Sequence, residues 1–366
     1  MTSLVSFINK SFAVFASDVF IRGNGVWLKT PEGVVSALSL PVFEPKEVQD
    51  FAQTFTAEGF LPAEYLQELG YKRSIDFAIS LPTEDDLEVR LRVHGFYSRG
   101  QVAFAVRLIP PTPKSLDDIG LDPRIQERLR HARGLFLVTG PTGAGKTTTL
   151  ATILQNIALH QGVHILTLED PLEYVIYPGK AVVHQKELHT DFNSFADGLR
   201  SALRESPDVV MVGEVRDLET LRWTLSLAEA GFLVLASYHT KTPQETVERI
   251  VGSFPESEQG QTRMRLASAL IGVLSQMLLP SGGGGKKAGA PRRRVVAYEY
   301  IFANDALRSV IRENKTQMIP NLITQETGVR LEETLARLVR NQLIDEYLGL
   351  AVAQNPSALR ALIRGA

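Results

Sequence analysis

The stretch from 134 to 149, GLFLVTGPTGAGKTTT, carries residues whose types and spacing suit phosphate binding. It predicts a strand, a glycine-rich turn and a helix, in that order. The pattern G-x-x-x-x-G-K-[ST] is matched by Gly140, Gly145, Lys146 and Thr147. The backbone N–H groups of such a loop, together with the positive end of the following helix, surround an anion. The stretch therefore predicts a nucleotide-binding loop.

Each position in this loop has a physical role. Gly140, Gly143 and Gly145 lack a Cβ, so the backbone can wrap closely around phosphates. We expect Lys146 to reach the β and γ phosphates of ATP and the Thr147 hydroxyl to ligate Mg²⁺. A chance glycine turn is disfavoured because both flanking elements are predicted. The complete set of predicted nucleotide-binding residues is Gly140, Pro141, Thr142, Gly143, Ala144, Gly145, Lys146, Thr147 and Thr148.

Further short apolar strands are predicted after the first, at 164–168, 209–212 and 233–237. Helical patterns alternate with them, which predicts a mostly parallel sheet covered by helices on both faces. Ligands bind at the carboxyl ends of the strands in such sheets. The strands are followed by Asp170, Glu214 and His239, so we expect these side chains to converge with the phosphate loop.

Hydrolysis of a nucleotide also needs a carboxylate that orients or deprotonates water. Glu214 is the best candidate, and because Gly213 stands where an aspartate is usual, this carboxylate would serve both the water and the outer shell of the metal. An acid at a helix N-terminus is the alternative for Glu214. Asp170 and Glu173 could equally cap a helix, and His239 could be a structural histidine.

Composition bounds the possible functions. The chain has 366 residues, enough for two or three domains, and its net charge of -2 gives no general attraction to nucleic acid or anionic lipid. The absence of cysteine excludes disulfides and four-cysteine zinc sites. No secretion signal is recognised, and the longest apolar stretch, 266–279, is too short and too interrupted to span a bilayer. We expect any membrane association to come through a partner.

Changes in the pattern of apolar, polar, proline and glycine residues along the chain predict several domains and linkers. In the first part, strands are expected at 26–29, 87–93 and 102–108 and helices at 45–59 and 62–69. Near the end, a strand is expected at 295–302 and a helix at 331–340. The predicted parts are a small α+β domain over 1–109, a proline-rich linker over 110–116, an α/β P-loop core over 117–280, a flexible glycine and basic loop over 281–294, and a C-terminal strand and helical subdomain over 295–366.

Several longer motifs match one known family. They are GPTGAGKTTTL (140–150), HILTLEDPLEYV (164–175), ALRESPDVVMVGEVRDLET (202–220) and SYHTKTPQETVERIVGSFPESEQ (237–259), with the shorter ASDVFI (16–21) and RLRVHGF with RLIP (90–96, 107–110). The chain closely resembles the hexameric type II/IV secretion ATPases, in particular the type IV pilus retraction motors of the PilT kind. The resemblance covers nearly the whole sequence.

The resemblance implies a RecA-like ATPase domain preceded by a small PAS-like domain, assembled as a homohexamer with ATP between neighbouring subunits. It implies ATP hydrolysis coupled to mechanical work, which powers pilus retraction and twitching motility through an inner-membrane platform protein. It places the protein in the cytoplasm, associated peripherally with the inner membrane through partners. No specific nucleic acid partner is expected.

The resemblance also implies roles for individual residues. The acidic box matches 169–173 with Glu173 as its functional acid, the Walker B glutamate matches Glu214, and the histidine box matches His239. The arginines that reach nucleotide from the N-terminal domain match Arg92 and Arg107, and Arg99 is a weaker match.

The sequence departs from the family pattern at two aromatic positions. Phe232 and Phe20 stand where the family commonly has histidine, and phenylalanine can neither carry a proton nor donate a hydrogen bond. Several alternatives therefore stay open. They are an accessory, PilU-like retraction ATPase, a related secretion or conjugation ATPase, a RecA-like nucleic-acid translocase, and a nucleotide-sensing subunit that joins a ring with an active paralogue.

Overall fold

The structure is a computed structural model of the chain. It describes residues 2–14, 16–30, 33–56, 63–82, 88–109, 115–282 and 294–365. Most of the predicted linker (110–114) and most of the predicted glycine-rich loop (283–293) lie outside the described residues, as do 57–59 and Pro62 of the two predicted helices. The chain divides into two compact units, one made mainly of residues 1–112 and the other mainly of residues 113–366.

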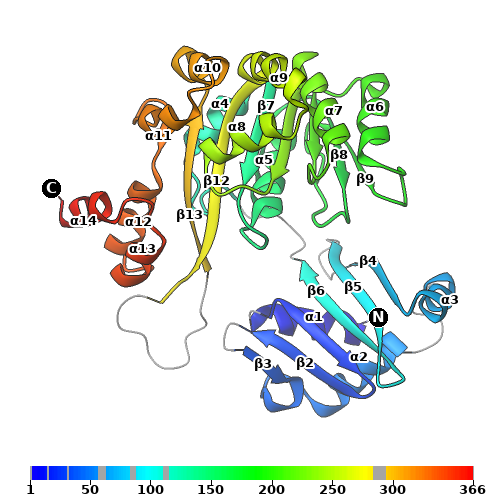
Figure 1. The fold of residues 1–366 in the computed structure, drawn as a ribbon. Coiled ribbons are helices and arrows are strands. Elements are labelled where there is room, and N and C mark those ends of the chain that lie inside the picture. Colours follow the sequence, from blue (N-terminus) through cyan, green and yellow to red (C-terminus); the bar gives the residue numbers. More distant parts are fainter. Residues whose placement is uncertain are drawn as a thin grey trace. The chain divides into compact units, whose positions relative to one another are not determined.

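The first unit is built on a six-stranded antiparallel sheet with the order β3-β2-β1-β6-β5-β4 (Figure 1). Its strands are β1 Asp18–Arg22, β2 Gly25–Thr30, β3 Gly33–Ser36, β4 Ser74–Pro82, β5 Glu88–Ser98 and β6 Gln101–Ile109. Its helices are α1 Thr2–Ala13, α2 Pro45–Thr56 and α3 Ala63–Lys72, with a short 3-10 helix at Ala37–Ser39.

Buried and partly exposed residues alternate along these strands, so one face of the sheet belongs to the core and the other is more polar. Val19 and Ile21 of β1 are buried, whereas Asp18 and Phe20 are only partly so. The buried face packs against aromatic side chains of α1 and α2, where the rings of Phe7 and Phe51 stack with centroids 3.9 Å apart. The predicted small α+β domain is therefore confirmed, with the strands extended by a few residues beyond their predicted ends.

The second unit is built on an eight-stranded, mostly parallel sheet with the order β14-β13-β12-β7-β11-β10-β8-β9. Its strands are β7 Gly134–Thr139, β8 His164–Glu169, β9 Val182–Glu187, β10 Val209–Val212, β11 Leu233–Tyr238, β12 Leu270–Pro280, β13 Arg294–Phe302 and β14 Gly328–Val329. Its helices are α4 Pro123–Leu129, α5 Lys146–His160, α6 Phe195–Glu205, α7 Leu218–Glu229, α8 Pro243–Gly252, α9 Glu256–Ala269, α10 Asp305–Arg312, α11 Ile319–Leu322, α12 Leu331–Arg340, α13 Glu346–Val352 and α14 Pro356–Arg364.

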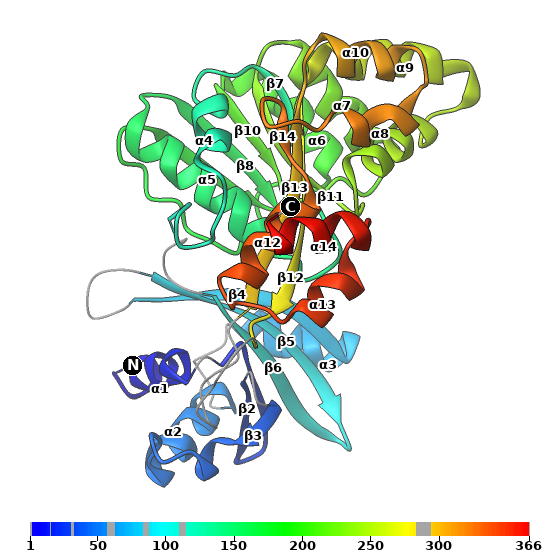
Figure 2. The same cartoon turned by 90° about the vertical axis from the view of Figure 1, so that its left-hand side faces the viewer.

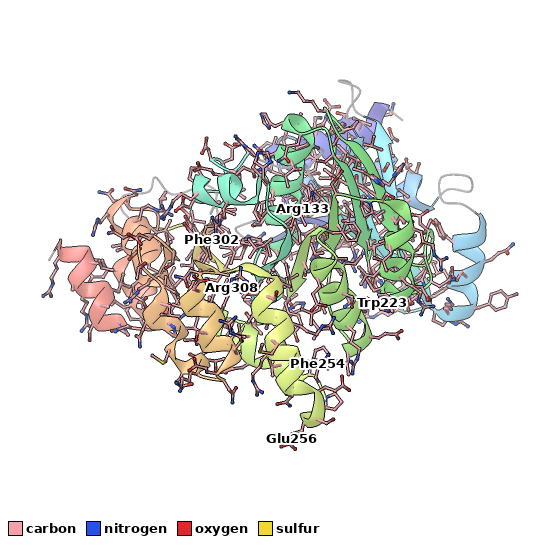
Figure 3. All side chains as sticks on the ribbon, turned by 90° about the horizontal axis from the view of Figure 1, so that it is seen from above. Arg133, Trp223, Phe254, Glu256, Phe302 and Arg308 are labelled. Carbon is pink, nitrogen blue, oxygen red and sulfur yellow. The ribbon has the colours of Figure 1, made fainter. Side chains whose placement is uncertain are left out.

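Helices cover both faces of this sheet. Figure 2 shows α4 and α5 on one side and α6 to α9 on the other. Two arginine side chains, which Figure 3 labels, donate hydrogen bonds to backbone carbonyls in the connections between elements. Arg308 of α10 donates to the carbonyl of Ser268 near the end of α9, at 2.8 Å, and Arg133 donates to the carbonyl of Gly231 at 2.7 Å. These bonds satisfy carbonyls that helix ends and turns leave without a backbone partner.

The predicted α/β class is confirmed, as are the four central strands and the helix at 331–340, which has the predicted bounds. Three strands of this sheet, β9, β12 and β14, were not predicted. The apolar stretch 266–279 contains the end of α9 and nearly all of β12, because a strand buried on both faces has a continuous apolar pattern. Among the helices of the described ranges, none combines the length and the hydropathy that a membrane-spanning segment needs.

The C-terminal helices cover the end of the β12–β13 hairpin. Leu279 and Ala297 pack against leucines of α12 and α14. A carboxyl group lies in this interface: Glu299 of β13 is 5% exposed and accepts a hydrogen bond from the amide of Gln354 at 2.8 Å. Burial raises the pKa of Glu299 to about 7, and the nearby charge of Glu332 adds to this effect while the bond from Gln354 opposes it.

Glu299→Gln should therefore remove a pH dependence of stability. Between about pH 4 and pH 7 the unfolded chain releases the Glu299 proton while the folded protein keeps it, so stability falls as pH rises through this window and is constant above it. Glutamine stays neutral, and we expect the variant to gain on the order of 3 kcal/mol relative to the parent from pH 4 to pH 8. Urea unfolding across this range measures the difference, with the exposed Glu326→Gln as control. If the stability difference between Glu299→Gln and the parent is the same at every pH, Glu299 does not have a raised pKa in the folded protein.

Candidate active site

The phosphate loop connects β7, whose residues are all buried, to the first turn of α5. Gly140, Gly143 and Gly145 have φ angles of 148°, 77° and 86°, in the region that side chains disfavour. A Cβ on Gly140 would also lie 2.3 Å from the carbonyl oxygen of Gln276. The predicted role of these glycines in letting the backbone turn tightly is thus borne out by the local geometry.

Lys146 lies in the loop and is 9% exposed. Its Nζ donates to the carbonyl oxygens of Gly140 at 2.9 Å and Pro141 at 3.2 Å, and lies 3.5 Å from Nδ1 of His239. Burial lowers the pKa of Lys146, and the charge of Glu214 opposes this shift. The loop therefore holds a cation whose present partners are neutral oxygens, which phosphate oxygens can replace.

Glu214 follows β10 and is bonded through both carboxylate oxygens. His239 Nε2 lies 2.9 Å from Oε1, and Arg216 Nη2 lies 2.8 Å from Oε2. Arg216 also reaches Asp170 Oδ2 with Nη1 at 3.2 Å. Burial raises the pKa of Glu214, but Arg216 and His239 outweigh it, so the net pKa lies below its ordinary value. Glu214 is accordingly a fixed, ionised carboxylate at neutral pH.

The convergence predicted from the strand ends is confirmed. β7, β11, β10 and β8 are neighbours in the sheet and all run parallel. Their carboxyl ends carry Lys146 in the loop, then His239, then Glu214, then Asp170, and each contacts the next directly or through Arg216.

The helix-capping alternatives for these acids are wrong. Glu214 is not at a helix N-terminus, because Asp217 caps α7 by accepting from the Thr220 N–H at 2.8 Å. The segment that contains Asp170 and Glu173 leads into β9 without forming a helix, so neither residue caps one. The side chain of His239 is 40% exposed and contacts Glu214 and Lys146, and its catalytic role stays a prediction beside the structural one.

Gly213 stands where related sites carry an aspartate, and the packing explains the small residue. Its N–H donates to the Leu168 carbonyl at 2.8 Å, and its own carbonyl accepts from Ser237 Oγ at 2.5 Å. A Cβ at this position would lie 3.0 Å from the Leu168 carbonyl oxygen and 3.3 Å from Glu169 Cα. Strand β8 thus approaches β10 too closely for an aspartate to be accommodated without displacement.

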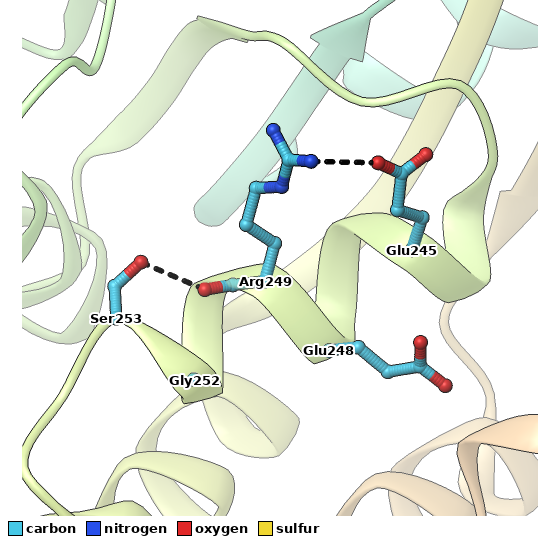
Figure 4. A pocket seen from close by; sticks show the side chains of 5 residues that line it. All are labelled: Glu245, Glu248, Arg249, Gly252 and Ser253. Atoms are coloured by element: carbon cyan, nitrogen blue, oxygen red, sulfur yellow. Dashed lines mark hydrogen bonds and ion pairs between the residues drawn. The ribbon is translucent and has the colours of Figure 1, made fainter.

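Sequence analysis missed three residues of this site. Arg216 bonds to Glu214, and Arg249 of α8 donates to the His239 carbonyl at 3.0 Å and to Glu245 Oε1 at 3.0 Å. Figure 4 shows the bond to Glu245 in an open hollow along α8. Gln276 of β12 bonds to the loop through both ends of its amide. Its only sequence signal is a polar residue that interrupts an apolar strand.

The residues present fit a nucleotide with its metal. Left-handed glycines, the N-terminus of α5 and the Lys146 ammonium suit phosphate oxygens. Thr147 is the second residue of α5 and is partly exposed, as the hydroxyl of a Mg²⁺ ligand must be. Within the described residues, no group of three or more acidic, histidine or cysteine side chains could hold a metal by itself.

Arg92 and Arg107 are direct cross-strand partners on β5 and β6. Arg107 Nε donates to Asp18 Oδ1 on β1 at 3.1 Å, with the arginine side chain 57% exposed. Arg99 lies at the turn between β5 and β6, with a φ of 51°. Seven residues of extended strand separate it from Arg92, which is roughly 20 Å. The structure therefore groups Arg92 with Arg107 and leaves Arg99 apart.

The remaining residues named by the resemblance lie in separate places. Glu173 is half-buried in the segment after β8, and its catalytic role stays a prediction. Phe232 precedes β11 and packs against the core, so it lies at the opposite end of this strand from His239. Phe20 lies on the half-exposed face of β1, paired with Trp27 and Ala105. Neither aromatic residue replaces a group that contacts Glu214.

Fold and site together define a P-loop nucleotide-hydrolysing protein. The family model for type II/IV secretion system proteins matches residues 76–345. The chain belongs to this family of ATPases.

The chain is similar in sequence to two curated proteins and in structure to a solved one. The twitching motility protein of Neisseria gonorrhoeae is 40% identical over 78% of this chain and 74% of its own length. The type IV pilus retraction ATPase PilT of Pseudomonas aeruginosa is 36% identical over 90% of this chain and 89% of its own. A crystal structure of the pilus retraction motor PilT with bound ADP matches with a TM-score of 0.81 and 35% identity, and covers 98% of each chain.

Two alanine variants test the loop geometry. Gly140→Ala adds both a left-handed backbone penalty and a Cβ that meets the Gln276 carbonyl, whereas a Cβ on Gly143 meets nothing within 4 Å. We expect Gly140→Ala to lower the free energy of unfolding by about 3 kcal/mol and Gly143→Ala by only about 1 kcal/mol. Urea denaturation of the two variants provides the comparison. Equal costs would show that the contact with β12 does not constrain the loop.

Proposed function

We propose that this chain is the subunit of a ring-shaped ATP-driven motor that powers type IV pilus retraction. The observation that carries the proposal is the unbroken set of contacts from Lys146 through His239 to Glu214 at the carboxyl edge of the sheet. Relatives named as a twitching motility protein and a retraction ATPase support the choice among the activities of this family.

The chain's residues divide the work of hydrolysis. The phosphate loop binds the β and γ phosphates, and Lys146 exchanges its carbonyl partners for phosphate oxygens. Glu214 orients the attacking water and accepts its proton, while Arg216 and His239 hold both carboxylate oxygens in place. Thr147 would hold Mg²⁺, with Glu214 serving its outer shell, and a metal bound there would supply charge neutralisation for the phosphates. Glu173 is the second acid in this proposal.

Arg92 and Arg107 are proposed to bind the phosphates from the N-terminal unit. Like charges placed directly opposite each other on neighbouring strands destabilise a sheet. Asp18 accepts hydrogen bonds from Arg107 Nε at 3.1 Å and from Ser17 Oγ at 2.7 Å, so its charge offsets part of the repulsion between the two arginines. An anion bound by the two guanidinium groups would relieve the repulsion, and arginine suits a phosphate because it can donate two parallel hydrogen bonds.

The assembly is proposed on the same basis. Six copies form a ring with nucleotide between neighbours, and the ring acts on an inner-membrane platform protein from the cytoplasmic side, attached to the membrane through that partner. A paralogous ATPase could share the ring. An accessory retraction ATPase, or a secretion or conjugation ATPase, would use the same catalytic residues. A nucleotide-sensing subunit is disfavoured because Lys146 and Glu214 are both present and in contact range of His239.

ATP turnover per chain, measured against protein concentration, tests the motor. We expect the rate per chain to rise with concentration, because a site shared between subunits is complete only in the ring. Glu214→Gln should bind ATP and lower kcat by at least roughly a hundredfold, since the amide cannot accept the proton. An inactive parent at every concentration with Mg²⁺ and ATP would exclude an autonomous motor. Stimulation by DNA would favour the translocase instead.

Alanine at Arg92 or Arg107 tests the arginine pair separately. We expect each variant to lower kcat at saturating ATP by roughly tenfold or more, because a cation that meets developing phosphate charge acts mainly in the transition state. Arg22→Ala, at the exposed end of β1, is the matched control and should retain the parent's kcat. Oligomeric state is measured in parallel by light scattering. Unchanged kcat in both variants would remove these arginines from the catalytic set.

A further inference from the structure

Gln276 is a buried amide in the middle of an apolar strand. It is 4% exposed, and its Nε2 donates to the Ala144 carbonyl at 2.7 Å while its Oε1 accepts from Thr149 Oγ1 at 2.9 Å. Ala144 precedes Lys146 in the loop, and Thr149 follows it in the first turn of α5. One side chain of β12 therefore binds the phosphate-binding segment on both sides of Lys146.

The bond to Ala144 fixes the orientation of one peptide unit in the loop. In a trans peptide, the carbonyl and the following N–H point in opposite directions. Because Gln276 holds the Ala144 carbonyl, the Gly145 N–H must point away from β12. Successive N–H groups that point inward, with carbonyls turned outward, are what an anion-binding nest requires.

The position also shows why this residue is an amide. An apolar side chain of similar length would fill the same space, and burying an amide costs free energy unless its polar atoms are paired. Both amide atoms are paired, and both partners belong to the phosphate-binding segment. The backbone carbonyl of Gln276 lies against Gly140 as well, so β12 contacts the beginning, the end and the following helix of the loop.

We propose that Gln276 is a positioning residue that holds the phosphate loop in its nucleotide-binding conformation. The inference rests on the proposed function, in which this loop binds ATP. Both polar atoms of its side-chain amide bond to the protein. It acts by keeping the Ala144 carbonyl out of the site and the start of α5 at a fixed distance from β12.

Titration with a fluorescent ATP analogue, followed by steady-state hydrolysis, tests the proposal. Gln276→Met keeps the length of the side chain but not its hydrogen bonds, and we expect Kd and KM for ATP to rise roughly tenfold or more. Thr149→Val should weaken binding less, and Thr149→Ser, which keeps the hydroxyl, should match the parent. The double variant should add little to Gln276→Met, because both changes disrupt one network.

Ser275→Ala is the matched control. Ser275 is also buried on β12, and its hydroxyl bonds to Thr139 at 2.8 Å. The substitution thus removes a comparable buried bond without touching Ala144 or Thr149, and should leave Kd unchanged. If Gln276→Met binds ATP as tightly as the parent, or if Ser275→Ala weakens binding equally, the positioning role is overturned. A parent that binds neither ATP nor ADP would overturn the proposed function and this inference together.

Discussion

The carboxylate of Glu214, shared between His239 and Arg216, joins the ends of neighbouring strands into one site. Through His239 it reaches Lys146 and the phosphate loop, and through Arg216 it reaches Asp170. These contacts exist only because the sheet order places β7, β11, β10 and β8 side by side with their carboxyl ends at one edge. A different strand order with the same sequence motifs would separate them.

Acidic side chains at the carboxyl edge of the sheet are paired with Arg216 before any ligand binds. Glu214 is flanked by the imidazole of His239 and the guanidinium of Arg216, and Arg216 in turn is shared with a second acid. Burial disfavours charge on Lys146, so its ammonium is less strongly solvated than a surface lysine and gains more from a phosphate. Its shortest hydrogen bonds to the protein go to the backbone carbonyl oxygens of Gly140 and Pro141, which phosphate oxygens can replace.

The two phenylalanines at family histidine positions illustrate the limit of pattern comparison. In the sequence, Phe232 stands in place of a histidine in the same family motif, the histidine box, that contains His239. In the structure the two residues lie at opposite ends of β11, a separation of about 20 Å at the usual rise per residue. The contacts of Glu214 are therefore intact. Phe232 packs against the core at the amino end of β11.

The phosphate loop, the alternation of strands and helices, and the polar residues that end each strand could be predicted from the sequence, because these features depend on local spacing and on the glycine and apolar patterns. Which of those residues contact one another depends on the order of the strands in the folded sheet. The strand at Leu270–Pro280 and the role of Gln276 depend on neighbours more than a hundred residues away in the chain. Arg216 and Arg249 could not be distinguished from surface arginines until their carboxylate and carbonyl partners were placed, because hydrogen bonding depends on distance and direction, which sequence spacing alone does not set.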